Sequence, residues 1–259
     1  MTQEQHNLIT DIHTHILPGL DDGARTIEEA LQMAQQAHSQ GITHLIATPH
    51  YIEDSVITKP DVIIKACQAL QGKLQEQQIP LTIYPGQEIF LSPHSAHQYD
   101  QGQLLTLAGT DYILIELPLQ TYPHWVADSI YELTLRGLKP ILAHPERYRH
   151  YSNNLEALQE LTAAGLHLQI NASSITGHMG PRAQQKAKKM LQAGLITYLG
   201  SDAHSPRTRT FHLTEALRTL KAWGINATYL LHNNNRLLHN EKPQQIDKPK
   251  RTWWQKLWA

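Results

Sequence analysis

The chain has 259 residues, of which 41% are hydrophobic, and its formal net charge is -1. This length suits one large α/β domain. The balanced charge predicts no nucleic-acid partner, because proteins that bind nucleic acid usually present a basic field. The polar residues 1–7 do not resemble a signal peptide, and no apolar run is long enough to cross a membrane.

The single cysteine, Cys67, excludes a disulfide within the chain and fits a reducing cytosol, so we expect a cytoplasmic protein. Cys67 lies in an apolar, helical run over residues 62–74. No Cys-x5-Arg phosphate-binding loop surrounds it. The sequence therefore predicts a buried packing residue there rather than a nucleophile.

Strands and helices are predicted to alternate along the chain. After a strand that begins near Ile9, Thr26 and Glu29 form a capping box for a helix that ends at Gly41. Further helices are predicted over residues 63–74, 125–135, 155–164, 182–193 and 211–223. The apolar strand segments between them are residues 45–47, 81–84, 112–115, 141–142, 166–170 and 195–199. This alternation predicts a parallel sheet that closes into a barrel.

Each strand-like run leads into side chains that can bind a metal ion or lie beside one. These are Asp11, His13, His15, His50, Glu88, Glu116, His144, Asn171, Asp202 and His204. In a barrel the carboxyl ends of all strands meet on one face, so we expect one cluster. A buried Glu88 or Glu116 would be costly unless it is paired or bound to a metal. Imidazole and carboxylate ligands suit Zn, Mn and Fe.

The motifs that carry these residues resemble those of the PHP (polymerase and histidinol phosphatase) superfamily. They are DIHTH at residues 11–15, TPH at 48–50, GQE at 86–88, HPERY at 144–148 and SDAH at 201–204. Within it, LPGLDDG at 17–23, ELP at 116–118 and HPERY are similar to the bacterial protein-tyrosine phosphatases of capsule and exopolysaccharide clusters. The resemblance runs from about residue 9 to residue 238, and it implies an α/β fold, the distorted seven-stranded (β/α)7 barrel of PHP type.

The resemblance also implies three divalent metal ions. One would take His13, His15, Glu88 and Asp202, a second Glu88, Glu116 and His144, and a third Asp22, His50 and His204. Asp21 stands beside Asp22, so the sequence leaves the choice between them open. Asp11 is expected beside the ligands rather than on a metal. Mn, Fe, Co and Zn all suit these ligands, with Mn or Fe favoured.

The implied activity is that of a metal-dependent protein-tyrosine phosphatase, a phosphoric monoester hydrolase that works through a metal-bridging hydroxide. Its implied substrate is a membrane-bound tyrosine autokinase that regulates capsular or exopolysaccharide synthesis. Arg147 and Arg209 are the expected phosphate-binding residues, with Arg207 as the alternative to Arg209. Glu146 is expected to orient Arg147 or to cap the following segment, and Tyr148 to line the pocket or to pack.

Two other functions stay open at this point. One is a small-molecule phosphatase of the same superfamily, such as a histidinol-phosphatase-like enzyme. The other is a non-catalytic metal-binding scaffold, which a missing ligand would favour; every expected ligand type is present.

We divide the chain into a phosphatase barrel over residues 1–240 and a polar linker with a short tail over residues 241–259. The tail places Trp253, Trp254, Leu257 and Trp258 on one face of a short helix, with basic residues around them. Such a segment either binds a membrane interface weakly or packs against its own domain or another subunit.

Overall fold

The computed structural model describes residues 8–152 and 154–244. The tail residues Trp253, Trp254, Leu257 and Trp258 lie outside the described residues, so the prediction about them stays a prediction. Two hydrogen bonds join the residues after 240 to the domain. The Tyr112 hydroxyl donates to the carbonyl of Glu241 (2.8 Å), and the Gln244 amide donates to Asn233 Oδ1 (2.7 Å). The first residues of the predicted linker therefore still contact the domain. No helix in the described ranges is long and apolar enough to cross a membrane.

The strands pair in parallel in two sheets, which have the orders β1-β2-β4 and β3-β5-β6-β7-β8-β9. Their bounds are β1 (Thr10–Thr14), β2 (His44–Ala47), β3 (His50–Tyr51), β4 (Thr82–Pro85), β5 (Glu88–Phe90), β6 (Tyr112–Glu116), β7 (Lys139–Ala143), β8 (His167–Asn171) and β9 (Tyr198–Gly200). All seven predicted strand segments are present. The last one begins at Tyr198, later than predicted.

Two predicted strands continue beyond a break, and the continuations were not predicted. The chain leaves β2 at Thr48 and Pro49 and re-enters as β3, because proline has no N–H to donate to a ladder. The break between β4 and β5 lies at Gly86, where a Cβ would come within 2.9 Å of Ile46 Cγ2 and Leu107 Cδ2. Because of these breaks, β3 begins at His50 and β5 begins at Glu88. Both residues are expected metal ligands.

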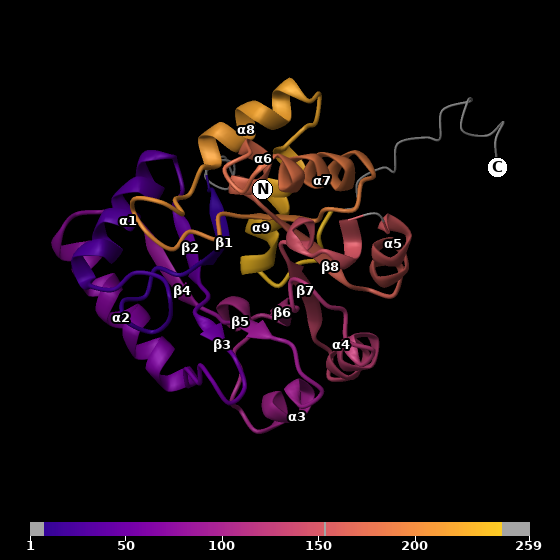
Figure 1. Cartoon of the computed structure of the whole chain (residues 1–259). Helices are drawn as coiled ribbons and strands as arrows, with labels where there is room; N and C mark the ends of the chain where they lie inside the picture. The colour runs from indigo at the N-terminus through magenta and orange to yellow at the C-terminus, as the bar shows by residue number, and fades with distance from the viewer. Residues whose placement is uncertain (1–7, 153, 245–259) are drawn as a thin grey trace.

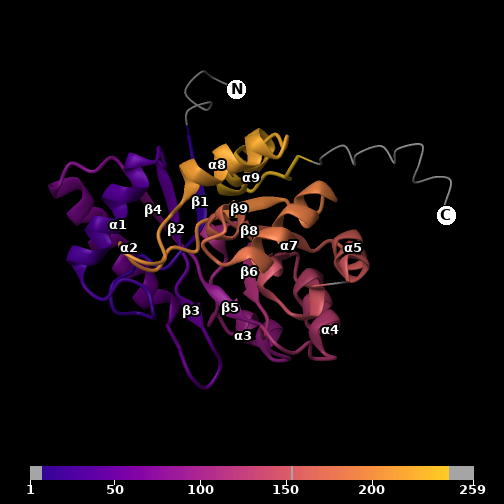
Figure 2. The ribbon, with the colours of Figure 1, turned by 45° about the horizontal axis from the view of Figure 1, so that its top comes forward.

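The first and last strands are neighbours. The His15 amide donates to the Ala203 carbonyl, and the Asp202 amide donates to the His13 carbonyl, both at 2.9 Å. Figure 2 shows β1 running beside β9. The pairings thus lead from β1 through the other strands to β9 and back, in the order that a seven-stranded barrel requires; the closed barrel itself stays a prediction.

Helices cover the outside of the strands (Figure 1). They are α1 (Ile27–Ser39), α2 (Pro60–Glu76), α3 (Ser95–Asp100), α4 (Val126–Leu135), α5 (Leu155–Ala163), α6 (Ala172–Thr176), α7 (Pro181–Gln192), α8 (Leu213–Ala222) and α9 (Thr228–Leu238). Every predicted helix is found within about two or three residues of its predicted ends, as is usual for such boundaries. The helix predicted from residue 211 begins at Leu213, because His212 before it has a left-handed backbone with φ 50°.

The sequence did not predict α3, α6 or α9. Of these, α9 is rich in asparagine, which favours helices poorly. Tertiary contacts compensate: Asn234 Nδ2 donates to the carbonyls of Thr10 (2.8 Å) and Leu199 (2.6 Å), which ties α9 to β1 and β9.

The apolar core has two parts. One lies among the strands and includes Ile12, Leu114 and Ile141; the larger one lies between strands and helices. Cys67 on α2 belongs to the larger part and is buried. Burial raises the pKa of its thiol to about 12, so it packs as an inert side chain, as predicted.

We predict that Gly23→Ala destabilises the fold, because an added Cβ would lie 2.0 Å from the His15 carbonyl oxygen. The expected loss in the free energy of unfolding is about 1–3 kcal/mol, as for other overpacked sites. Urea denaturation measures it. The matched control is Gly72→Ala on α2, where a Cβ meets nothing within 4 Å. This change should raise stability by about 0.5–1 kcal/mol through helix propensity. Equal midpoints for Gly23→Ala and the unchanged protein would contradict the tight approach.

Candidate metal centre

The carboxyl ends of the strands bring the predicted ligand side chains together. His13 lies on β1 and His15 just after it; His50 and Glu88 begin β3 and β5, and Glu116 ends β6. His144 follows β7, and Asp202 and His204 follow β9. Asp22 joins them from the loop after β1. His50 and Glu88 are direct register partners, so the pairing of β3 with β5 fixes their separation.

Glu88 lies at the centre of this cluster and is almost fully buried. Its Oε2 lies 3.2 Å from His13 Nε2, 3.3 Å from His15 Nε2 and 3.2 Å from His50 Nδ1. Its Oε1 lies 3.0 Å from His144 Nε2. Burial opposes the charged form, but the surrounding imidazoles outweigh burial and hold the Glu88 pKa well below its usual range. The distances above place each oxygen of the Glu88 carboxylate beside at least one imidazole nitrogen.

Asp202 forms a second buried anionic group. Its Oδ1 lies 3.6 Å from the Nε2 atoms of both His13 and His15. The residue has a left-handed backbone with φ 54°, which is uncommon for a residue other than glycine and typical of functional sites. Glu116 lies 3.7 Å from His144 Nε2; burial and the nearby charge of Glu88 raise its pKa.

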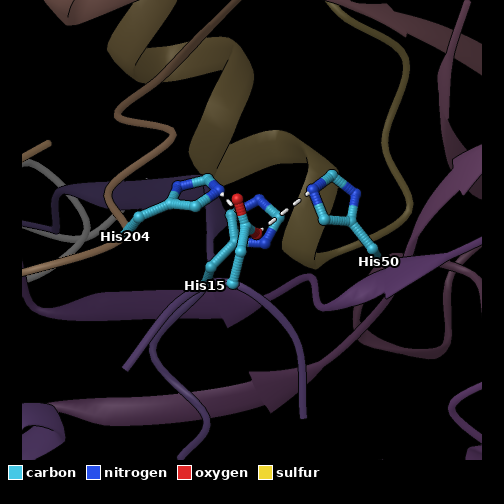
Figure 3. Close-up of side chains that lie close together, drawn as sticks. His15, His50 and His204 are labelled. Carbon is cyan, nitrogen blue, oxygen red and sulfur yellow. Dashed lines mark ion pairs between the residues drawn. The ribbon is translucent and has the colours of Figure 1, made fainter. Parts of the chain in front are cut away.

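The structure separates the roles of the two adjacent aspartates. Asp22 Oδ1 lies 3.2 Å from His204 Nε2 and 3.5 Å from His50 Nε2. Figure 3 shows the His15 ring between the His50 and His204 rings. Asp21 instead accepts hydrogen bonds from His15 Nδ1 (2.6 Å) and from the His50 amide (3.0 Å). Asp22 therefore faces the cluster, whereas Asp21 holds the His15 ring in place.

Metal ions fit this arrangement. Zinc bonded to nitrogen and oxygen at 2.0–2.1 Å in a tetrahedron separates neighbouring ligand atoms by about 3.3 Å, close to the distances above. Glu88 Oε2, His50 Nδ1 and His204 Nε2 are buried without a hydrogen-bond partner. The atoms around them are close but not in hydrogen-bonding geometry. Without a metal ion, the lone pairs of these three atoms would be buried and unsatisfied.

Three overlapping groups could each hold an ion. They are His13, His15 and Glu88; His50, Glu88 and Glu116; and His15, Asp22, His50 and His204. They overlap with the predicted division but differ from it: Asp202 is not in the first group, His50 stands in the second where His144 was predicted, and His15 joins the third. His144 approaches the second group through Glu88 and Glu116.

A chain of buried amides lies behind the cluster; the sequence analysis named Asn171 at a strand end but did not predict Gln169 or its link to His13. Asn171 Nδ2 donates to Asp202 Oδ2 (2.7 Å), and Gln169 Nε2 donates to Asn171 Oδ1 (2.9 Å). Gln169 Oε1 then lies 2.9 Å from His13 Nδ1. A carboxylate only accepts hydrogen bonds, so it sets the direction of the whole chain. His13 therefore carries a proton on Nδ1, so that the neutral ring could offer the Nε2 lone pair to a metal ion beside Glu88. The alternation of side chains along β8 was the available signal, since Gln169 and Asn171 share a face.

Two arginines lie at the edge of the cluster and contact Asp202. Arg147 Nη1 lies 3.2 Å from Asp202 Oδ2, and Arg209 Nη2 lies 2.9 Å from Asp202 Oδ1. Arg209 Nη1 also lies 3.7 Å from Asp22 Oδ2. Their side chains are 21% and 33% exposed, so each remains open to solvent on one side. Arg207 is exposed on the same loop.

Three other residues take supporting positions. Glu146 Oε1 accepts from the amide of Asn171 (3.2 Å), the last residue of β8, so it ties the segment after β7 to the end of β8. Tyr148 is buried, and its hydroxyl accepts from the Leu117 amide (3.1 Å), so it packs rather than lines a pocket. Asp11 Oδ1 accepts from the amides of His13 and Ser201, as expected for a residue beside the ligands.

Residues 9–239 match the family described as capsular polysaccharide synthesis, CpsB/CapC. The chain belongs to this family. The expected resemblance to the capsule-cluster phosphatases is thereby confirmed at the level of the family.

Named members of the family are similar over most of their length. "Tyrosine-protein phosphatase YwqE" of Bacillus subtilis is 36% identical over 247 residues, which is 93% of this chain and 97% of the relative. "Putative tyrosine-protein phosphatase CapC" of Staphylococcus aureus is 33% identical and covers 96% and 98% of the two chains. A solved structure from work on YwqE and on CpsB from Streptococcus pneumoniae, described as unique metal-dependent tyrosine phosphatases, matches with a TM-score of 0.87. It is 36% identical, and the match covers 93% of this chain and all of that one.

We predict that Gln169→Leu weakens divalent-ion binding by about 10–100-fold, because loss of a partner that orients a ligand has this effect in other metal sites. Competition with a chromogenic chelator measures the affinity. Gln184→Leu is the control, since Gln184 Nε2 donates to the Ile175 carbonyl (3.0 Å) instead of to a residue of the cluster. An unchanged affinity in Gln169→Leu would remove the orienting role of the amide chain.

Proposed function

We propose that this chain is a metal-dependent protein-tyrosine phosphatase. The observation that carries the proposal is the convergence of His13, His15, Asp22, His50, Glu88, Glu116, His144, Asp202 and His204 beside two partly exposed arginines. The relatives named as tyrosine phosphatases support it, since they align over more than nine-tenths of the chain.

In this proposal the cluster binds three divalent ions, one for each overlapping ligand group. Mn and Fe are favoured, and Co and Zn also suit the ligands. Bound divalent ions acidify water at neutral pH and offset the negative charge of a phosphate. The carboxylate of Glu88 would hold two of the ions, since its two oxygens face different imidazoles.

Arg147 and Arg209 would bind the phosphate oxygens of the substrate. Asp202 contacts one nitrogen of each guanidinium, which orients the side chain in advance and leaves other N–H groups for the ligand. Preorganised donors of this kind stabilise charge that develops during phosphoryl transfer. The leaving phenol of tyrosine has a pKa of about 10, so its departure needs no strong general acid.

The substrate we propose is phosphotyrosine on a bacterial tyrosine autokinase of the membrane that regulates capsular or exopolysaccharide synthesis. Membership of a capsular polysaccharide family supports this choice. The buried free thiol of Cys67 fits a cytoplasmic site of action.

Turnover of a phosphotyrosyl peptide compared with histidinol phosphate tests the substrate class. A much higher kcat/KM for the peptide supports the proposal. Preference for histidinol phosphate would favour a small-molecule phosphatase, and no turnover of either compound by metal-loaded protein would favour a scaffold.

We predict that Arg147→Ala and Arg209→Ala each lower kcat/KM on the phosphotyrosyl peptide by about 10²–10³-fold, as expected for removal of a charge-stabilising donor. Metal content by mass spectrometry should stay near that of the unchanged protein. Arg207→Ala is the matched control on the same loop and should keep full activity, since Arg207 is exposed. Loss of activity in Arg207→Ala with a silent Arg209→Ala would reverse the assignment.

We predict that Cys67→Ser keeps both its metal content and its phosphatase activity. The reason is that the Cys67 thiol is buried on α2 and its pKa is raised to about 12. Stability falls modestly because the new hydroxyl is buried in an apolar setting. A folded, metal-loaded Cys67→Ser protein without activity would indicate a cysteine nucleophile instead.

A further inference from the structure

A second group of metal-ligand side chains lies outside the cluster described above. It consists of His178, His212 and Glu215. His178 follows α6, His212 immediately precedes α8, and Glu215 is in the first turn of α8. The helices α6 and α8 lie side by side (Figure 1), so segments far apart in the sequence meet here.

One oxygen atom is common to both histidine contacts. Glu215 Oε2 lies 3.1 Å from His178 Nε2 and 3.5 Å from His212 Nδ1. The two imidazole rings stack with centroids 3.9 Å apart and planes tilted by 23°. The two nitrogen–oxygen separations, rather than the ring spacing, lie close to the edge of about 3.3 Å that neighbouring ligand atoms form around a tetrahedral zinc ion.

The remaining nitrogen of His212 has a partner that suits a metal ligand. His212 Nε2 lies 3.1 Å from Thr210 Oγ1. A metal-binding imidazole usually donates its second N–H to such an oxygen, which fixes both the ring and its protonation. The His212 backbone is also left-handed, with φ 50°, and holds the side chain against Glu215 in an uncommon conformation.

A simple surface ion pair accounts for less of this geometry. An ion pair needs a protonated imidazole, and two stacked imidazoles resist charging together. The pair of His94 and Glu53 shows the simple case, with one histidine nitrogen 2.8 Å from one carboxylate oxygen. In the second group, by contrast, two nitrogens converge on the same oxygen.

We propose that His178, His212 and Glu215 form a separate binding site for zinc or a similar divalent transition metal, with water completing the coordination. Two imidazoles, one carboxylate and a water are an established ligand set for zinc. The side chains of His178 and Glu215 are 50% and 52% exposed, so an ion can reach them from solvent.

The site would join two loops at the carboxyl ends of the strands. His212 is three residues after Arg209, whose carbonyl accepts from the His204 amide (2.8 Å). An ion shared between His178 and His212 would therefore fasten the loop that carries Arg209 to the segment after α6. The site itself does not depend on the proposed phosphatase activity.

The test measures total divalent metal per chain by mass spectrometry, after the full-length, metal-loaded protein is equilibrated with zinc chloride and freed of unbound ions. The sum of all metals is counted, so exchange of zinc into the main cluster does not alter the total. The variants are His178→Ala and Glu215→Gln. The matched control is His94→Ala, which removes an exposed histidine that faces one carboxylate.

The unchanged protein and His94→Ala should each hold about one more ion per chain than His178→Ala and Glu215→Gln. Zinc should also raise the melting temperature of the first two proteins more than that of the other two, because a ligand that binds only the folded state stabilises it. Equal totals in all four proteins would overturn the proposal. Loss of an ion in His94→Ala as well would overturn it too, because exposed histidines would then bind zinc without a built site.

Discussion

The burial of Glu88 among imidazoles is the constraint on which the rest of the site depends. A carboxylate removed from water is strongly destabilised unless positive charge or hydrogen-bond donors surround it. The imidazoles that contact Glu88 come from β1, β3 and the segment after β7, so no single loop could supply them. The parallel strands are needed because only their carboxyl ends bring these segments to one point.

Several anionic groups accumulate at this point. Glu116 lies close enough to Glu88 for the negative charge of Glu88 to raise its pKa. Asp202 lies beside the same histidines, and two arginines already contact it. Divalent cations would balance the remaining charge and satisfy the unpaired lone pairs. The same cations and arginines would then attract a dianionic phosphate group, which links the stability of the site to its proposed chemistry.

The sequence predicted the features that local chemistry determines. The Thr26 cap and the glycine at position 41 mark the ends of α1, because caps and left-handed turns act over a few residues. Only half of the predicted capping box forms, since the Glu29 carboxylate accepts from the amide of Arg25 instead of that of Thr26. The convergence of the His, Asp and Glu side chains could also be predicted, since strand ends meet on one face in a barrel. The family follows from the motifs and is confirmed by the match over residues 9–239.

The remaining features depend on contacts between distant segments. Nothing local distinguishes Asp21 from Asp22; the distinction arises because His15 bonds one and His204 meets the other. The role of Gln169 requires His13, Asn171 and Asp202 to be adjacent in space. The helix α9 has a poor local propensity and depends on bonds from Asn234 to two strands.

A crystal structure of the metal-loaded protein, with diffraction data collected on both sides of the absorption edges of the bound metals, would locate the ions and identify each metal. We expect ions in the three overlapping ligand groups, with the two oxygens of Glu88 bound to different ions at about 2.0–2.3 Å. Ions bound elsewhere, or a Glu88 carboxylate that contacts no ion in a fully active crystal, would contradict this arrangement.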